Sequence, residues 1–302
     1  MIRVIRAVFY SNLYLGFCSV ALCIETNLLI NVSLNKFPFY ILIFLCTCIY
    51  YTSIYIRSAG ARMYNERTLW YRNNLTRIKA VYKITIIVAL AFFVIFTFRN
   101  RYTLLSLTPY QIFLIIAFPA AAAWYRFAPP FFRLKKIRQT GWIKPFIIGL
   151  TWMGCVTIYP LLTRHLQTGE LKPASVIPTV LLCILNFLFF FINAVIFDIK
   201  DVQIDRYHHL RTFPVILGIK NTFRFIILPA AVLYAGTFLM FQQQQHFTAL
   251  QTTIQLIPYL LLVYTIFTYK QSRNVLYYLV AVDGLVFVKA VCGITSILFL
   301  KK

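Results

Sequence analysis

Residues 197–206 read Phe197-Asp198-Ile199-Lys200-Asp201-Val202-Gln203-Ile204-Asp205-Arg206 and come directly after a long apolar run at 174–197. The whole sequence contains seven acidic residues, and three of them fall within this short stretch. On a helix, Asp198, Asp201 and Asp205 would share an arc of roughly 60°, so one face would carry three carboxylates. Such carboxylates repel each other and are costly to bury unless cations compensate them. The pattern predicts a Mg²⁺ site, because this ion binds oxygen ligands together with substrate phosphates. The alternative is a solvated charged turn that pairs with its own arginines.

The composition excludes a soluble globular protein, because 61% of the residues are hydrophobic and only 12% are charged. Apolar runs recur along the full length, which predicts one helical, multi-pass membrane domain over residues 1–302. The net charge of +23 is typical of a membrane protein with basic cytosolic loops and an affinity for anionic lipid, and no motif for nucleic acid accompanies it. The seven cysteines all lie in predicted spans and are interpreted as buried, inert thiols.

Apolar windows of about 20 residues, the length that crosses a bilayer, predict nine spans near 8–32, 39–56, 80–98, 108–127, 145–163, 174–197, 222–241, 253–269 and 275–299. If the N-terminus is cytosolic, 22 of the 30 Lys and Arg residues lie inside and seven lie outside. This bias agrees with the positive-inside rule and supports nine spans with a cytosolic N-terminus. The membrane is predicted to be a cell inner or plasma membrane. The stretch 128–144 is interpreted as a basic linker facing lipid headgroups.

The acidic stretch and the residues directly after it carry a family resemblance. Asp198, Asp201, Asp205 and Arg206, together with Arg211-Thr212-Phe213-Pro214-Val215 and Gly218 downstream, resemble the second aspartate-rich motif of the UbiA superfamily of membrane prenyltransferases. That family has nine transmembrane helices, with this motif between the sixth and seventh on the cytosolic side. The resemblance therefore implies a UbiA-like bundle of nine helices.

The chemistry that the resemblance implies is transfer of a prenyl group from an isoprenyl diphosphate to a small lipophilic acceptor, commonly an aromatic ring. Asp198, Asp201 and Asp205 would be Mg²⁺ ligands, and Arg206 and Arg211 would contact the diphosphate. Asn193, just before the motif, would help to hold the site, or would instead make a hydrogen bond between helices. An aromatic-lined chamber would shield the allylic cation from water.

The sequence departs from the family at the first aspartate-rich motif, which belongs after the second span. The corresponding stretch, 50–67, contains no aspartate, and its one carboxylate is Glu66. Arg57, Arg62 and Arg67 would then meet the diphosphate directly, since arginine binds phosphate without a metal. The alternative is that these arginines only reflect the positive-inside rule.

Further polar residues remain without a firm role. Asp283 and Lys289 lie six residues apart in the last span, where ionisable groups are usually functional or paired. Asp283 is predicted either to reach the chamber or to pair with a loop arginine. Glu25 in the first span is unassigned, and His208 and His209 are either proton acceptors or polar residues at headgroup level.

The sequence thus predicts an integral membrane prenyltransferase with Mg²⁺ on three aspartates. One alternative is a catalytically silent relative that binds a prenyl diphosphate or lipid. Another is a secondary transporter that uses the aspartates as its ion site, for which acidic or broken-helix positions at mid-membrane would be expected.

Overall fold

The computed structural model describes residues 7–59, 66–127, 141–168, 176–267 and 279–299. These residues form helices joined by short turns, with no strand among them, so the predicted all-α class is confirmed for the described part of the chain. In chain order the main helices are α2 (Leu13–Leu29), α3 (Phe37–Ser58), α4 (Glu66–Asn73), α5 (Leu75–Arg99), α6 (Arg101–Leu105), α7 (Pro109–Phe127), α9 (Lys144–Met153), α10 (Tyr159–Thr168), α11 (Val176–Lys200), α12 (Val202–Tyr207), α13 (Phe213–Leu217), α14 (Ile219–Thr222), α15 (Leu228–Gln245), α16 (Ala249–Phe267) and α18 (Gly284–Leu298).

Six of the helical segments in the described residues are long and apolar enough to cross a membrane, so the chain is an integral membrane protein. They are Phe37–Arg57, Leu75–Arg99, Gly141–Thr168, Val176–Lys200, Ile219–Gln245 and Leu279–Leu298. Three shorter apolar helices, Leu13–Leu29, Pro109–Trp124 and Ala249–Thr265, coincide with the other three predicted windows. The count of nine spans and the cytosolic N-terminus stay predictions.

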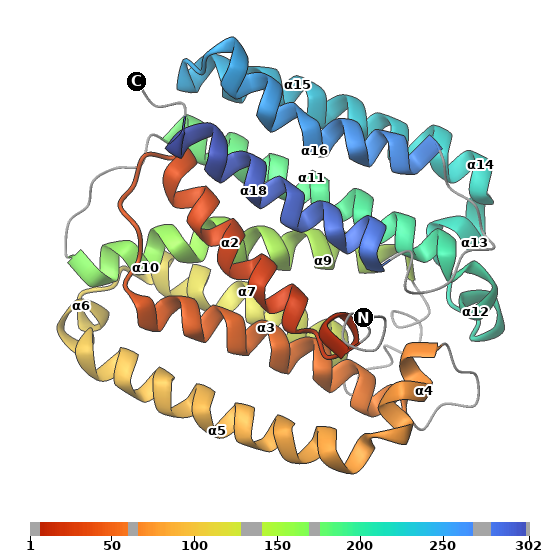
Figure 1. Cartoon of the computed structure of the whole chain (residues 1–302), viewed down its shortest axis with the longest axis horizontal. Coiled ribbons are helices and arrows are strands. Elements are labelled where there is room, and N and C mark those ends of the chain that lie inside the picture. The colour runs from red at the N-terminus through yellow and green to blue at the C-terminus, as the bar shows by residue number, and fades with distance from the viewer. Residues whose placement is uncertain (1–6, 60–65, 128–140, 169–175, 268–278, 300–302) are drawn as a thin grey trace.

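Helix α11 lies at the centre of the bundle and packs most extensively against α9 and α15 (Figure 1). In its apolar window 72% of the residues are buried, against 6% for α5, which packs mainly against α3 at the edge of the bundle. A helix that is apolar on every side can be buried by protein or exposed to lipid. The acidic stretch therefore sits at the end of the most enclosed helix, while α5 faces lipid.

A π-helical segment, η2 (Gly154–Ile158), joins α9 to α10 within one span. Such a wide turn leaves backbone carbonyls open to partners on other helices. The Thr26 hydroxyl of α2 donates to the Val156 carbonyl at 2.7 Å, and the Asn186 amide of α11 donates to the Thr157 hydroxyl at 2.8 Å. The irregular turn thus fixes the first helix and the central helix to the same point.

A buried ion pair connects the first and last helices of the bundle. The Lys289 ammonium donates to both Glu25 carboxylate oxygens, at 3.0 and 2.8 Å, and both side chains are almost fully buried. Lys289 is therefore paired with a residue 264 positions away in sequence. Gly293 makes room for this carboxylate, because a Cβ atom at that position would lie 2.4 Å from Glu25 Oε1.

A Gly293→Ala variant is expected to lose about 1–3 kcal/mol of stability, because the added methyl group would overlap a carboxylate held by Lys289. Thermal unfolding of the purified protein in detergent measures this loss. Gly284→Ala in the same helix is the matched control, since a Cβ there meets nothing within 4 Å. Equal unfolding temperatures for the two variants would contradict the close approach at Gly293.

Candidate active site at the end of α11

The three aspartates of the motif lie on two consecutive helices. Asp198 is in the last turn of α11, Asp201 forms the junction, and Asp205 is in α12. The backbone stays nearly helical through the junction, because Asp201 N donates to Phe197 O at 3.1 Å and Asp205 N donates to Asp201 O at 2.8 Å. Figure 1 shows α12 and α13 at the same end of the molecule as α4.

Asp198 is fully buried and forms an ion pair that the sequence pattern does not predict. The Lys144 ammonium, at the start of α9, lies 2.5 Å from Asp198 Oδ1. The other oxygen, Asp198 Oδ2, is buried and has no hydrogen-bond partner. An unpartnered carboxylate oxygen in the interior is costly, so this atom is available to a cation or a hydrogen-bond donor.

Asp205 shares this environment. Asp205 is 6% exposed, and its Oδ2 atom is also buried without a hydrogen-bond partner. The pKa of the Asp205 carboxyl is raised to about 6, mainly by burial. The positive charge of Lys144 opposes this shift, and the negative charges of Asp198 and Asp201 add to it. The three carboxylates and Lys144 thus form one electrostatic cluster.

Asp201, Arg206 and Arg211 lie toward the outside of this cluster. Asp201 is partly exposed and pairs with the neighbouring Lys200 at 3.1 Å. Arg206 and Arg211 are exposed, and neither forms an ion pair with a described residue. No group of three or more His, Cys, Asp or Glu side chains in the described ranges is arranged to hold a metal ion. The Mg²⁺ assignment therefore stays a prediction, and Asp198 and Asp205 are its best placed ligands.

Asn193 is 5% exposed on α11, and neither atom of its side-chain amide has a hydrogen-bond partner. The helix–helix hydrogen bond considered from the sequence is thus not formed within the described part of the chain. A buried amide in this state is costly unless a ligand or water satisfies it. Asn193 therefore belongs with Asp198 and Asp205 as a buried group that still lacks a partner.

The region of the missing first motif is held by protein contacts. Arg67 is buried, and its guanidinium donates to the Tyr55 hydroxyl at 2.9 Å, to the carbonyls of Phe9 and Tyr10, and to Asn12 Oδ1. These contacts use the Nη1 and Nη2 atoms of Arg67, while its Nε atom is buried without a hydrogen-bond partner. The diphosphate contact of Arg67 stays a prediction. The Tyr10 hydroxyl donates to Glu66 at 3.3 Å.

Arg57 is exposed at the end of α3, and Arg62 lies outside the described residues.

Close contacts hold the start of α9 against the segment after α12. The Trp142 backbone N–H donates to the Arg211 carbonyl at 3.0 Å. A Cβ atom on Gly141 would lie 2.6 Å from Thr212 Cγ2, so the two backbones meet where only glycine fits. This contact places Lys144 beside Asp198. The only sequence signal for Lys144 is its position as a basic residue directly before an apolar span.

The fold that carries this cluster can be compared with known proteins. The chain is similar to the solved structure of digeranylgeranylglyceryl phosphate synthase, with a TM-score of 0.56 and 15% sequence identity over 97% of this chain and 99% of that chain. The two proteins share one fold. No family model and no curated protein matches the sequence. The predicted bundle architecture is thus confirmed at the level of the fold that this synthase adopts.

Proposed function

We propose that the chain is an integral membrane prenyltransferase that transfers an isoprenyl group from an isoprenyl diphosphate to a small lipophilic acceptor. The cluster of Asp198, Asp205 and Lys144 at the end of the central helix carries this proposal. Two facts support it together. The chain shares the fold of digeranylgeranylglyceryl phosphate synthase, and residues 198–218, which include Asp198 and Asp205, resemble the second aspartate-rich motif of the UbiA superfamily of membrane prenyltransferases.

In the reaction, the bond between the allylic carbon and the diphosphate oxygen breaks, and its electron pair leaves with the diphosphate. The acceptor supplies the electron pair of the new bond and then releases a proton. Negative charge therefore grows on the diphosphate as the bond breaks. The Lys144 ammonium stabilises this charge when it turns from Asp198 to a phosphate oxygen, and Arg206 and Arg211 close over the outer phosphate from the exposed side.

The donor atoms of the site fit Mg²⁺, because the Oδ2 atoms of Asp198 and Asp205 are hard oxygen ligands that are buried without partners. These two residues would hold the ion, and Asp201 would join them if it left Lys200. The ion, when bound, neutralises the charge of the diphosphate. Asn193 would orient the bound donor through its amide.

Aromatic side chains of the neighbouring helices provide a dry wall for the prenyl group. Trp152 of α9 stacks on Phe190 of α11 with ring centroids 4.5 Å apart, and its indole N–H donates to the Tyr51 hydroxyl at 2.7 Å. Aromatic faces stabilise a developing allylic cation, and the exclusion of water protects it from hydrolysis.

A second candidate function is a silent relative that binds a prenyl diphosphate or a lipid without turnover. One observation favours it, because Lys144 already neutralises Asp198 and the stretch around Glu66 and Arg67 is used for protein contacts. Such a protein would bind the diphosphate group through Lys144 and release no product.

The two functions are separated by measuring binding and turnover on the same preparation. Radiolabelled prenyl diphosphates of several chain lengths are incubated with the full chain in lipid nanodiscs, Mg²⁺ and a mixture of phenolic and alcohol acceptors. The proposed function predicts a labelled lipophilic product and release of diphosphate. Saturable binding without product would support the silent relative, and neither binding nor product would contradict both.

A further inference from the structure

A small cavity lies beside Leu182 and Leu185 of α11. These residues precede Asp198 by 16 and 13 positions, which is roughly 20 Å along the helix at a rise of about 1.5 Å per residue. The volume of the cavity is about 20 Å³, and apolar side chains of α11, α15 and α16 form most of its wall. The polar part of the wall consists of Glu25, Lys289 and Gln255. The cavity is therefore separate from the candidate active site.

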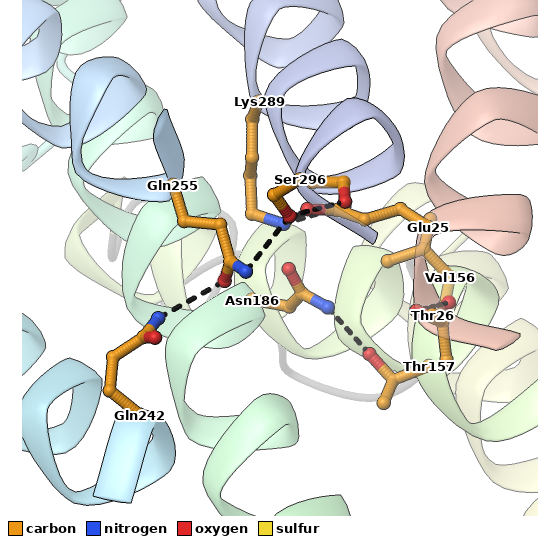
Figure 2. A network of polar contacts seen from close by, with 10 residues as sticks. Glu25, Thr26, Val156, Thr157, Asn186, Gln242, Gln255, Lys289 and Ser296 are labelled. Carbon is orange, nitrogen blue, oxygen red and sulfur yellow. Dashed lines mark hydrogen bonds and ion pairs between the residues drawn. The ribbon is translucent and has the colours of Figure 1, made fainter. Parts of the chain in front are cut away.

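The polar residues around this cavity belong to a network across four helices, α2, α15, α16 and α18, and Figure 2 shows their side chains. Gln242 of α15 donates to Gln255 of α16 at 3.1 Å, and Gln255 donates to the Ser296 hydroxyl of α18 at 2.9 Å. The Glu25–Lys289 pair adds α2 to this group. The network spares the bundle the cost of buried, unpaired polar groups at membrane depth.

Lys289 and the nearby Asn186 have hydrogen-bonding capacity left over. Lys289 donates to the two oxygens of Glu25 and so uses two of its three N–H groups. Asn186 of α11 is fully buried, and its Oδ1 atom has no hydrogen-bond partner. Figure 2 shows the Asn186 side chain between Thr157 and the Glu25–Lys289 pair, with its oxygen directed toward the pair. Asn186 is not part of the cavity wall, but it lies one turn after Leu182 and directly after Leu185, which both line the cavity.

We propose that this cavity is a binding site for one ordered water molecule, which accepts from Lys289 and donates to Asn186 Oδ1 and Glu25. A cavity must offer more than about 10–15 Å³ and two to four polar partners to hold a water, and this site meets both requirements. The bound water completes the hydrogen bonding of the ion pair and connects α11 to α2 and α18. The water thereby adds hydrogen bonds between helices at the end of the bundle that is remote from Asp198.

Hydroxyl-radical footprinting of the full chain in nanodiscs tests this site, because radicals formed from a bound water modify the side chains beside it. Phe238 lines the cavity and Phe190 does not, although both are buried at 5% and 3% exposure. Phe238 is expected to be modified faster than Phe190, because a bound water would lie beside Phe238 alone. Equal rates for the two residues would overturn the proposal.

Two variants test whether the named residues hold the water. Asn186→Leu removes the acceptor, and the double variant Glu25→Leu with Lys289→Met removes the ion pair without leaving a charge behind. In either protein the modification of Phe238 should fall to the rate of Phe190. If Asn186→Leu fails to fold, the double variant provides the same readout. Unchanged modification of Phe238 in the folded double variant would also overturn the site.

Discussion

An Asp198→Asn variant is expected to lose at least about a hundredfold of the prenyl-transfer rate, the typical cost of removing one group that stabilises transition-state charge. The substitution keeps the shape of a fully buried side chain and removes its charge. Lys144 then loses its ion pair with Asp198. The Oδ2 atom that would bind Mg²⁺ is replaced by an amide nitrogen or by an amide oxygen, which is a weaker ligand than a carboxylate. Initial rates with a radiolabelled prenyl diphosphate measure the effect, and thermal unfolding checks that the variant is folded.

Glu66→Gln is the matched control for this experiment, because it makes the same carboxyl-to-amide change in the stretch that replaces the first aspartate-rich motif. Glu66 receives a hydrogen bond from the Tyr10 hydroxyl at 3.3 Å, and an amide oxygen accepts this bond equally well. Its transfer rate should stay within about a factor of two of the wild type, because a bond to a neutral donor contributes little. Similar transfer rates for Asp198→Asn and the wild type would show that Asp198 is not part of the active site.

The second large effect is expected on stability. A Lys289→Met variant should lose about 3–5 kcal/mol, because it leaves the Glu25 carboxylate buried without its cation. The double variant Glu25→Leu with Lys289→Met should regain most of this loss, since an apolar pair of similar size replaces both charges. Unfolding of the three proteins in one detergent, followed by tryptophan fluorescence, measures both differences.

This cycle of variants distinguishes a structural pair from two independent residues. If the single and double variants were equally destabilised, the energy of Lys289 would not come from its contact with Glu25. A loss below about 1 kcal/mol in the single variant would place the pair in a hydrated environment, contrary to its burial.

The apolar pattern of the sequence is sufficient to predict the helices and the position of the acidic motif, because each predicted span overlaps an apolar helix. The scarcity of acidic residues identifies Asp198 and Asp205, because three of the seven in the chain lie close together there. The junction between α11 and α12 at Asp201 is missed, since helical spacing alone does not reveal where one helix ends and the next begins.

Contacts between distant parts of the chain are beyond the sequence pattern. Lys144 reads as part of a basic linker, yet the packing of α9 on α11 brings it to Asp198, 54 residues away. Arg67 is expected at the diphosphate, whereas residues near the N-terminus supply the carbonyls that bind it. In both cases a charge is visible in the sequence, but its partner depends on which helices become neighbours in three dimensions.

The contact between Gly141 and Thr212 has a mechanical consequence. It fastens the start of α9 to the segment after the acidic helix, and the hydrogen bond from Trp142 to Arg211 reinforces it. The backbone at the start of α9 and the backbone at Arg211 are therefore coupled. A displacement of one segment is expected to carry the other, so Lys144 and Arg211 would approach or leave a bound anionic headgroup together.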